Sequence, residues 1–288
     1  MNGIIVINKP IGCTSYNIVY GVKKIFKEKV GHTGTLDPLA TGVLPILIGK
    51  GTKLSNYLIE HDKEYIATLK LGKKTDTLDA EGEVIEEREV DDNIFNKDKI
   101  DEVLNKFIGK IEQIPPLYSA IKVNGKKLYE YARNGQNVEV KPRQVEIYKI
   151  NLLNIDKEQK EIKFKVNCSK GTYIRTLCLD IAEKLGSIGY MSSLQRTRVG
   201  RFKIEDAITI DELEKNEQNN EFLNKKLISI EDIFIDKEVI NLDDTKSFLN
   251  GVKIKIKKED GIYRIYNNNN FMGTGIIENN LLKRDLVI

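Results

Sequence analysis

The stretch Gly31–Leu44, GHTGTLDPLATGVL, constrains the fold of this chain more than any other. Its glycines accept positive φ or allow another backbone segment to approach closely. Pro38 fixes its own φ and restricts Asp37 to extended conformations, which presets the direction of the Asp37 carboxylate. Two interpretations fit this stretch alone. Asp37 caps a short helix that begins at Pro38, or a rigid loop aims the carboxylate for a function.

Composition limits the class of protein. The chain has 288 residues, of which 40% are hydrophobic, so it can bury a core in one large domain or in one large and one small domain. Its 46 basic and 43 acidic residues leave a formal net charge of only +3, so any nucleic-acid surface must be local. No apolar run approaches the roughly 20 residues that a membrane span needs. The N-terminus lacks the pattern of a signal peptide, and we expect a cytoplasmic protein.

Residues that bind metals or nucleotides are scarce. Cys13, Cys168 and Cys178 are odd in number and far apart, which favours free thiols in a reducing compartment. With two histidines and no Cys/His cluster, we expect no metal site. The segment Gly49–Thr52 follows an apolar run as a phosphate-binding loop would. However, the first glycine of that motif would fall at Leu44, so the motif fails.

Hydrophobic periodicity predicts an α+β fold. Ser15 is the expected N-cap of the first helix, and Thr172 that of a later helix over Ile174–Leu185. From about Phe234 onward, short β-like pieces predict a small, mainly β unit. The expected strands are Gly3–Asn8, Val43–Ile48, Glu64–Leu71, Tyr118–Val123, Val145–Leu153, Ile162–Cys168 and Leu194–Lys203. The further expected helices are Ile18–Phe26, Thr52–Ile59, Ile100–Ile108, Lys126–Asn134 and Asp211–Glu217.

Two basic regions stand out. The strand over Leu194–Lys203 carries Arg196, Arg198, Arg201 and Lys203 at strand spacing, which predicts one basic face. The segment from Ile114 mixes basic residues with tyrosines, a combination suited to an RNA strand because cations meet phosphates and rings offer stacking faces. A solvated hairpin whose tyrosines cover the core fits that segment equally well. Its residues are Tyr118, Lys122, Lys126, Lys127, Tyr129, Tyr131 and Arg133.

Arg175 is expected in the first turn of its helix, where the helix dipole disfavours a positive charge. It therefore needs an anionic partner, and a carboxylate elsewhere in the chain is the obvious kind. The alternative is an arginine that points outward into solvent.

Several long motifs coincide in order and spacing. They are INKPxGxTS, GHTGTLDPLATGVLP, DKEYIATLKLG, TDTLDAEG, IPPLYSAIKVNGKKLYEYARNG, SKGTYIRTLCLDIAEKLG and LQRTRVGRF. Together they closely resemble the bacterial tRNA pseudouridine synthases of the TruB family, over roughly residues 1–235. The C-terminal part resembles the small PUA-type RNA-binding domain of that family only in position, size and β pattern.

The resemblance implies roles for individual residues. Asp37 matches the catalytic aspartate, a nucleophile toward ribose C1′ or base C6, and Arg175 matches the arginine that pairs with it. Tyr65 matches the tyrosine that stacks on the extruded base and helps remove the C5 proton. Three further positions, His32, Tyr173 and Leu194, match residues around the target uridine. Lys9 matches a structural lysine near the site, and Lys122, Lys126, Lys127, Arg133 and Arg196 are the expected RNA contacts.

The resemblance also implies an architecture and partners. We expect a catalytic domain over 1–235, with a central, largely antiparallel mixed sheet flanked by helices and an RNA-gripping insertion at about 114–135. A PUA-like domain would follow over 236–288. The expected substrate is the T-stem-loop of tRNA, modified at uridine 55 by base flipping. Because the reaction is a redox-neutral isomerisation, we expect no cofactor, and we expect a monomer that needs no protein partner. Two alternatives remain: a non-catalytic tRNA-folding chaperone and a guide-RNA-dependent synthase.

Overall fold

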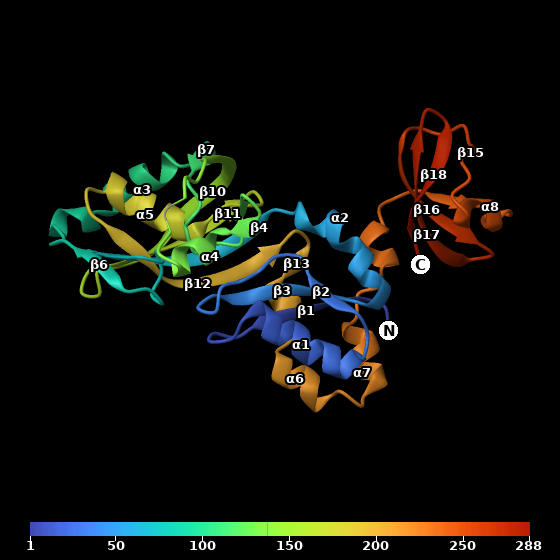
Figure 1. Ribbon diagram of the computed structural model, residues 1–288, viewed down its shortest axis with the longest axis horizontal. Coiled ribbons are helices and arrows are strands. Elements are labelled where there is room, and N and C mark those ends of the chain that lie inside the picture. The colour runs from blue at the N-terminus through green and yellow to red at the C-terminus, as the bar shows by residue number, and fades with distance from the viewer. Residues whose placement is uncertain (137) are drawn as a thin grey trace.

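The computed structural model describes residues 1–136 and 138–288. A long sheet runs through the larger part of the molecule, with helices against it, and a smaller β unit lies at one end (Figure 1). The α+β class is confirmed. No helix in the described part of the chain is long and apolar enough to cross a membrane.

The main sheet has nine strands, in the order β1-β3-β12-β4-β11-β10-β7, with β2 on β3 and β13 on β12. All pairings are antiparallel except the short contact between β3 and β12, so the expected mixed, largely antiparallel sheet is confirmed. The strands are β1 (Gly3–Lys9), β2 (Val30–His32), β3 (Thr41–Ile48), β4 (Lys63–Leu71), β7 (Gly109–Gln113), β10 (Arg143–Asp156), β11 (Glu161–Cys168), β12 (Gly189–Val199) and β13 (Phe202–Lys203).

Two groups of helices cover the two halves of this sheet (Figure 1). One buried cluster joins α1 to the inner side chains of β1 and β3, and another joins α3 and α5 to β4 and β11. The helices are α1 (Ser15–Phe26), α2 (Ser55–Ile59), α3 (Lys97–Asn105), α4 (Leu128–Arg133), α5 (Ile174–Lys184), α6 (Ile210–Lys215), α7 (Asn220–Lys226) and α8 (Thr245–Leu249). Short 3₁₀ turns lie at Gly49–Leu54, Asp92–Phe95, Ile204–Asp206 and Glu231–Phe234.

The parallel contact between β3 and β12 requires a glycine. Gly42 has φ +104°, and a Cβ atom there would lie 2.2 Å from the carbonyl oxygen of Arg196. No side chain fits between two backbones at that distance, so the two strands approach only because residue 42 is glycine. This contact fixes the end of the Gly31–Leu44 loop against β12.

Several expected element ends are wrong. The N-cap of α1 is Thr14, whose hydroxyl accepts from Asn17 N, while Ser15 is already helical and bonds elsewhere. Tyr173, not Thr172, precedes α5, because the Thr172 hydroxyl donates to Ser169 O instead of capping the helix.

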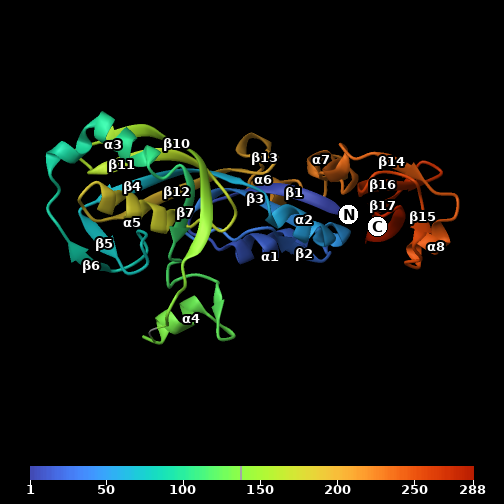
Figure 2. The ribbon, with the colours of Figure 1, turned by 90° about the horizontal axis from the view of Figure 1, so that it is seen from above.

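The expected strand over Tyr118–Val123 shrinks to β8 (Lys122–Val123), which pairs with β9 (Lys126–Lys127). Leu128 N and Tyr129 N donate to Ile121 O and Ser119 O, so these residues form a turn rather than a ladder. Asn124 and Gly125 both have positive φ, the conformation of the type I′ turn that an Asn-Gly pair favours. In Figure 2, this segment with α4 projects away from the main sheet.

The C-terminal segment forms its own five-stranded sheet, in the order β14-β16-β17-β18-β15. The small, mainly β unit expected from about Phe234 onward is confirmed, whereas the short helix α8 was not expected. Phe248 of α8 lies fully buried in the core of this unit. The strands are β14 (Val239–Asn241), β15 (Ile254–Lys255), β16 (Gly261–Asn267), β17 (Asn270–Glu278) and β18 (Leu281–Val287).

Candidate active site

Residues of β4, β10, β12 and α5, with the Gly31–Leu44 loop, line a cavity of about 580 Å³. Asp37, Tyr65, Tyr173, Arg175 and Leu194 all line it, although they lie far apart in the sequence. The structure therefore brings together five of the residues that the sequence predicted for the site.

The loop that carries Asp37 contains no helix, so the interpretation of Asp37 as an N-cap is wrong. Ala40 N donates to Asp37 O at 3.0 Å, which closes a single turn over Pro38. The Ser15 hydroxyl at the start of α1 donates to Leu36 O and accepts from Leu36 N, at 3.0 and 2.8 Å. The first turn of α1 thus clamps the residue before Asp37, and this clamp positions the carboxylate.

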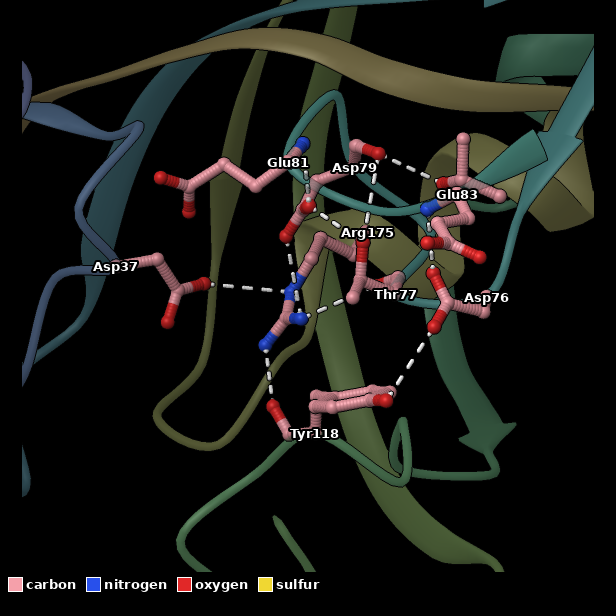
Figure 3. A network of polar contacts seen from close by, with 9 residues as sticks. Asp37, Asp76, Thr77, Asp79, Glu81, Glu83, Tyr118 and Arg175 are labelled. Carbon is pink, nitrogen blue, oxygen red and sulfur yellow. Dashed lines mark hydrogen bonds and ion pairs between the residues drawn. The ribbon is translucent and has the colours of Figure 1, made fainter. Parts of the chain in front are cut away.

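Arg175 reaches the loop from the first turn of α5. Its Nε lies 3.3 Å from Asp37 Oδ2, which confirms the expectation of a carboxylate partner (Figure 3). Nη1 and Nη2 donate to Thr77 O and Tyr118 O at 3.1 and 2.8 Å. The Arg175 side chain is only 7% exposed, whereas that of Asp37 is 39% exposed. The arginine is therefore fixed on three sides, and the carboxylate keeps a face open toward the cavity.

Asp79 is a second partner of Arg175 that the sequence reasoning missed. Its Oδ2 lies 3.2 Å from Arg175 Nη1, and its side chain is 4% exposed (Figure 3). Its Oδ1 accepts from Thr77 Oγ1 at 2.6 Å and from Glu81 N at 3.1 Å. The only sequence signal for it was its place in the TDTLDAEG motif, since the surrounding segment reads as a polar loop.

Burial dominates the electrostatics of the Asp37 carboxyl. It raises the pKa of Asp37 above the ordinary value, the ion pair with Arg175 opposes that rise, and the charge of Asp79 adds to it. Burial likewise raises the pKa of Tyr65 to about 12, against the opposing charge of Arg196.

Tyr65 on β4 lies directly opposite Arg196 on β12. The predicted exposed basic face of this strand is wrong at Arg196, whose side chain is 1% exposed. Its Nε donates to Val43 O and its Nη2 to Gly34 O, at 2.8 and 3.0 Å. The Gly31–Leu44 loop covers this arginine, so Arg196 lies behind Tyr65 in the cavity wall rather than on an outer RNA surface.

Lys9 and His32 lie close to the Asp37 loop but not in the cavity wall. The buried ammonium of Lys9 donates to the carbonyls of Pro10, Cys13 and Pro38 at 2.9, 2.7 and 3.2 Å. It therefore ties the end of β1 to the residue after Asp37. His32 accepts a hydrogen bond at Nδ1 from Gly34 N, at 3.3 Å.

The basic residues of the insertion lie outside the cavity. Lys122, Lys126 and Arg133 are exposed, and Lys127 is half-buried. The cations of Lys127 and Arg133 lie 5.3 and 5.4 Å from the centre of the Tyr129 ring. Two cations of this segment thus lie near one tyrosine ring.

Within the described residues, no group of three or more His, Cys, Asp or Glu side chains could hold a metal ion.

Two family models match the chain: "TruB family pseudouridylate synthase (N terminal domain)" at residues 23–174, and "tRNA pseudouridylate synthase B C-terminal domain" at residues 175–234. Proteins named tRNA pseudouridine synthase B are similar over nearly their whole length. The one from Clostridium kluyveri is 44% identical over 286 residues, 96% of each chain. That from Francisella philomiragia is 44% identical over 276 residues, 94% of this chain and 90% of the relative.

A solved structure titled "Crystal Structure of a Cbf5-Nop10-Gar1 Complex" contains a chain with the same fold. It has a TM-score of 0.70 and 27% identity, and the match covers 99% of this chain and 84% of that one. The motifs, the site geometry and the similarity over the full length agree: the chain belongs to the TruB family of pseudouridylate synthases.

Proposed function

We propose that this protein converts uridine to pseudouridine at position 55 in the T-loop of tRNA, with Asp37 as the nucleophile. The observation that carries the proposal is the Asp37 carboxylate, held by Arg175 at 3.3 Å in a cavity that Tyr65 also lines. The name of the relatives, tRNA pseudouridine synthase B, supports tRNA as the substrate.

The target atoms of a uridine in a folded loop are inaccessible, so the nucleotide must turn out of its stack into the cavity. Asp37 then attacks ribose C1′ or base C6, and both routes break the bond between C1′ and N1. The uracil rotates, C5 bonds to C1′, and the bond between Asp37 and the nucleotide breaks, which regenerates the carboxylate. The proton lost from C5 balances the proton gained at N1, so no oxidant or reductant is required. A covalent carboxylate intermediate splits one difficult exchange into easier steps.

The other residues support this chemistry. Arg175 aims the carboxylate and favours its ionised form. The Tyr65 ring stacks on the extruded base, and its hydroxyl helps remove the C5 proton. Tyr173 and Leu194 complete the wall around the nucleotide. His32 precedes Thr33 of the cavity wall, and its ring would brace the space left by the flipped nucleotide, while Lys9 holds the Asp37 loop.

We propose that the insertion at about 114–135 grips the T-loop through Lys122, Lys126, Lys127 and Arg133. The unit over 236–288 would be a PUA-like domain that adds RNA contacts beyond the loop. The reaction needs neither cofactor nor protein partner, and we expect a monomer that acts in the cytoplasm.

Two alternatives remain. The first is a synthase that catalyses the same reaction but needs a guide RNA, and the second is a chaperone that folds tRNA without modifying it. Incubation of the purified chain with an isolated T-stem-loop, followed by mapping of pseudouridine, separates the three. We expect modification at uridine 55 alone. A requirement for a guide RNA would favour the first alternative, and binding without any product would favour the second.

A further inference from the structure

The side chain of Gln113, the last residue of β7, reaches the residue at which α5 begins. Its Nε2 donates to Tyr173 O at 3.3 Å, and its Oε1 accepts from Tyr173 N at 3.0 Å. Gln113 is 2% exposed, so both hydrogen bonds are shielded from solvent. One carboxamide therefore holds both backbone groups of a residue that lies 60 positions further along the chain.

This contact requires a carboxamide. An amide side chain offers a donor and an acceptor next to each other, which matches the N–H and C=O groups of a single residue. The reverse orientation of the amide would set its NH₂ group against Tyr173 N and its oxygen against Tyr173 O, so only the observed orientation satisfies both. Within the described residues, the Tyr173 side chain makes no capping hydrogen bond for α5. Gln113 thus fixes the start of a helix that its own N-cap side chain does not hold.

The start of α5 carries two residues of the proposed active site. Tyr173 lines the cavity, and Arg175 follows two positions later, with its Nε 3.3 Å from Asp37 Oδ2 (Figure 3). Tyr173 O also accepts from Leu177 N at 3.0 Å, which is a hydrogen bond of the first helical turn. A displacement of the Tyr173 backbone would therefore carry Arg175 with it.

The chain that follows Gln113 makes two further hydrogen bonds to this turn. Thr176 Oγ1 donates to Ile114 O at 3.2 Å, and Arg175 Nη2 donates to Tyr118 O at 2.8 Å. The helix backbone and the Arg175 guanidinium are therefore both held against one short segment. Gln113 is the residue of that segment that determines where the helix begins.

We propose that Gln113 is a positioning residue: by holding Tyr173, its carboxamide sets the distance from Arg175 to the nucleophile. The inference rests on the proposed function and extends it to a residue outside the lining of the cavity, as the described residues form that lining. The expected effect is large for a residue without substrate contact, because a displacement of about 1 Å in an active site can cost up to about 100-fold in rate.

The test is Gln113→Glu, which keeps the length of the side chain and its acceptor. The ionised carboxyl accepts from Tyr173 N but has no donor for Tyr173 O. The protonated carboxyl regains that donor, and burial raises the pKa of the introduced group. We expect the single-turnover rate of pseudouridine formation on the T-stem-loop to fall about tenfold at alkaline pH. The ratio of the variant rate to the wild-type rate should then rise as the pH falls.

Two further variants separate positioning from a loss of stability. Gln113→Met keeps the length of the side chain but removes both hydrogen-bonding groups, so its rate should fall at every pH, with a constant ratio to wild type. Asn219 Oδ1 accepts from Phe222 N at 3.1 Å and holds the start of α7. Asn219→Ala should lower the melting temperature and leave the rate unchanged. All rates are measured where the chains are fully folded.

The affinity for RNA provides a readout that is independent of rate. We expect the dissociation constant of the T-stem-loop to stay within about threefold of wild type in every variant, because none of them removes a group of the cavity wall. Weaker binding with an unchanged single-turnover rate would overturn the inference, since Gln113 would then act on the RNA rather than on Arg175.

Two other results would also overturn it. One is a wild-type rate in Gln113→Glu and Gln113→Met. The other is a folded Gln113→Glu chain whose rate ratio does not change with pH, because the loss would then not depend on the donor to Tyr173 O. If Gln113→Glu does not fold, the rate and affinity of Gln113→Met decide alone. Absence of product from the wild-type chain would instead refute the proposed function, so the two failures are distinguishable.

Discussion

Asp79→Asn tests whether the second carboxylate on Arg175 matters for catalysis. The substitution keeps the size of the side chain and an oxygen at Oδ1, which accepts from Thr77 Oγ1 and Glu81 N. It removes the charge that lies 3.2 Å from Arg175 Nη1. Arg175 is then held by Asp37 and two backbone carbonyls alone.

A hydrogen bond between charged groups contributes about 1.5–3 kcal/mol. Both partners here are buried, so solvent screening reduces that contribution little. At about 1.4 kcal/mol for each factor of ten, we expect kcat to fall about 10- to 100-fold, because Arg175 no longer aims the Asp37 carboxylate.

The pH profile provides a second readout for Asp79→Asn. The negative charge of Asp79 contributes to the raised pKa of Asp37, so its removal lowers that pKa. The acid limb of kcat/KM should therefore move to lower pH in the variant. The assay is initial-rate pseudouridine formation across a pH series.

Asp76→Asn is the matched control for that experiment. Asp76 lies in the same loop and accepts from Glu83 N and the Tyr118 hydroxyl, but it does not contact Arg175. We expect less than a threefold change in kcat. Equal effects of the two substitutions, or an unshifted acid limb in Asp79→Asn, would refute the reasoning.

Three further predictions follow from the same geometry. Arg175→Lys keeps the charge but not the fork of donors, so kcat/KM should fall at least about tenfold; undiminished turnover would remove the ion pair from the mechanism. Gly42→Ala places Cβ 2.2 Å from Arg196 O at φ +104°, and urea denaturation should show a loss of at least about 2 kcal/mol. Because the pKa of Asp37 is raised and its ionised form reacts, wild-type kcat/KM should decline with falling pH at a midpoint above the value of about 3.9 for an exposed aspartate; a midpoint at or below that value would contradict the burial of the carboxyl.

The pairing of Asp37 with Arg175 was predictable from the sequence because each residue carried a local signal. Asp37 lay in a segment rich in glycine with a following proline, and Arg175 lay where a helix dipole requires an anion. The resemblance of the long motifs to the TruB family then indicated that these two residues pair with each other. The strand β11 was predictable for a similar reason, since the strict alternation over Ile162–Cys168 indicates one buried face.

The roles of Asp79 and Arg196 were not predictable in this way. Asp79 is buried by contacts with Arg175, Thr77 and Glu81. The pattern of residues around Asp79 in the sequence does not indicate that it contacts a helix far along the chain.

Spacing correctly placed Arg196 and Arg198 on one strand, but the expected continuation to Lys203 is wrong, because β12 ends at Val199, Arg201 lies in a turn and Lys203 belongs to β13. Spacing did not indicate which of these basic residues the Gly31–Leu44 loop would cover, because that depends on the close approach at Gly42.

The most direct test of the account follows the C5 proton. A T-stem-loop labelled with tritium at C5 of the target uridine releases the label only when C5 bonds to the ribose. Under single-turnover conditions, we predict stoichiometric release by the wild-type chain and none detectable by Asp37→Asn, with RNA affinities that agree within about threefold because the substitution keeps the shape of the cavity. Release by Asp37→Asn at the wild-type rate would contradict the assignment of Asp37 as the nucleophile.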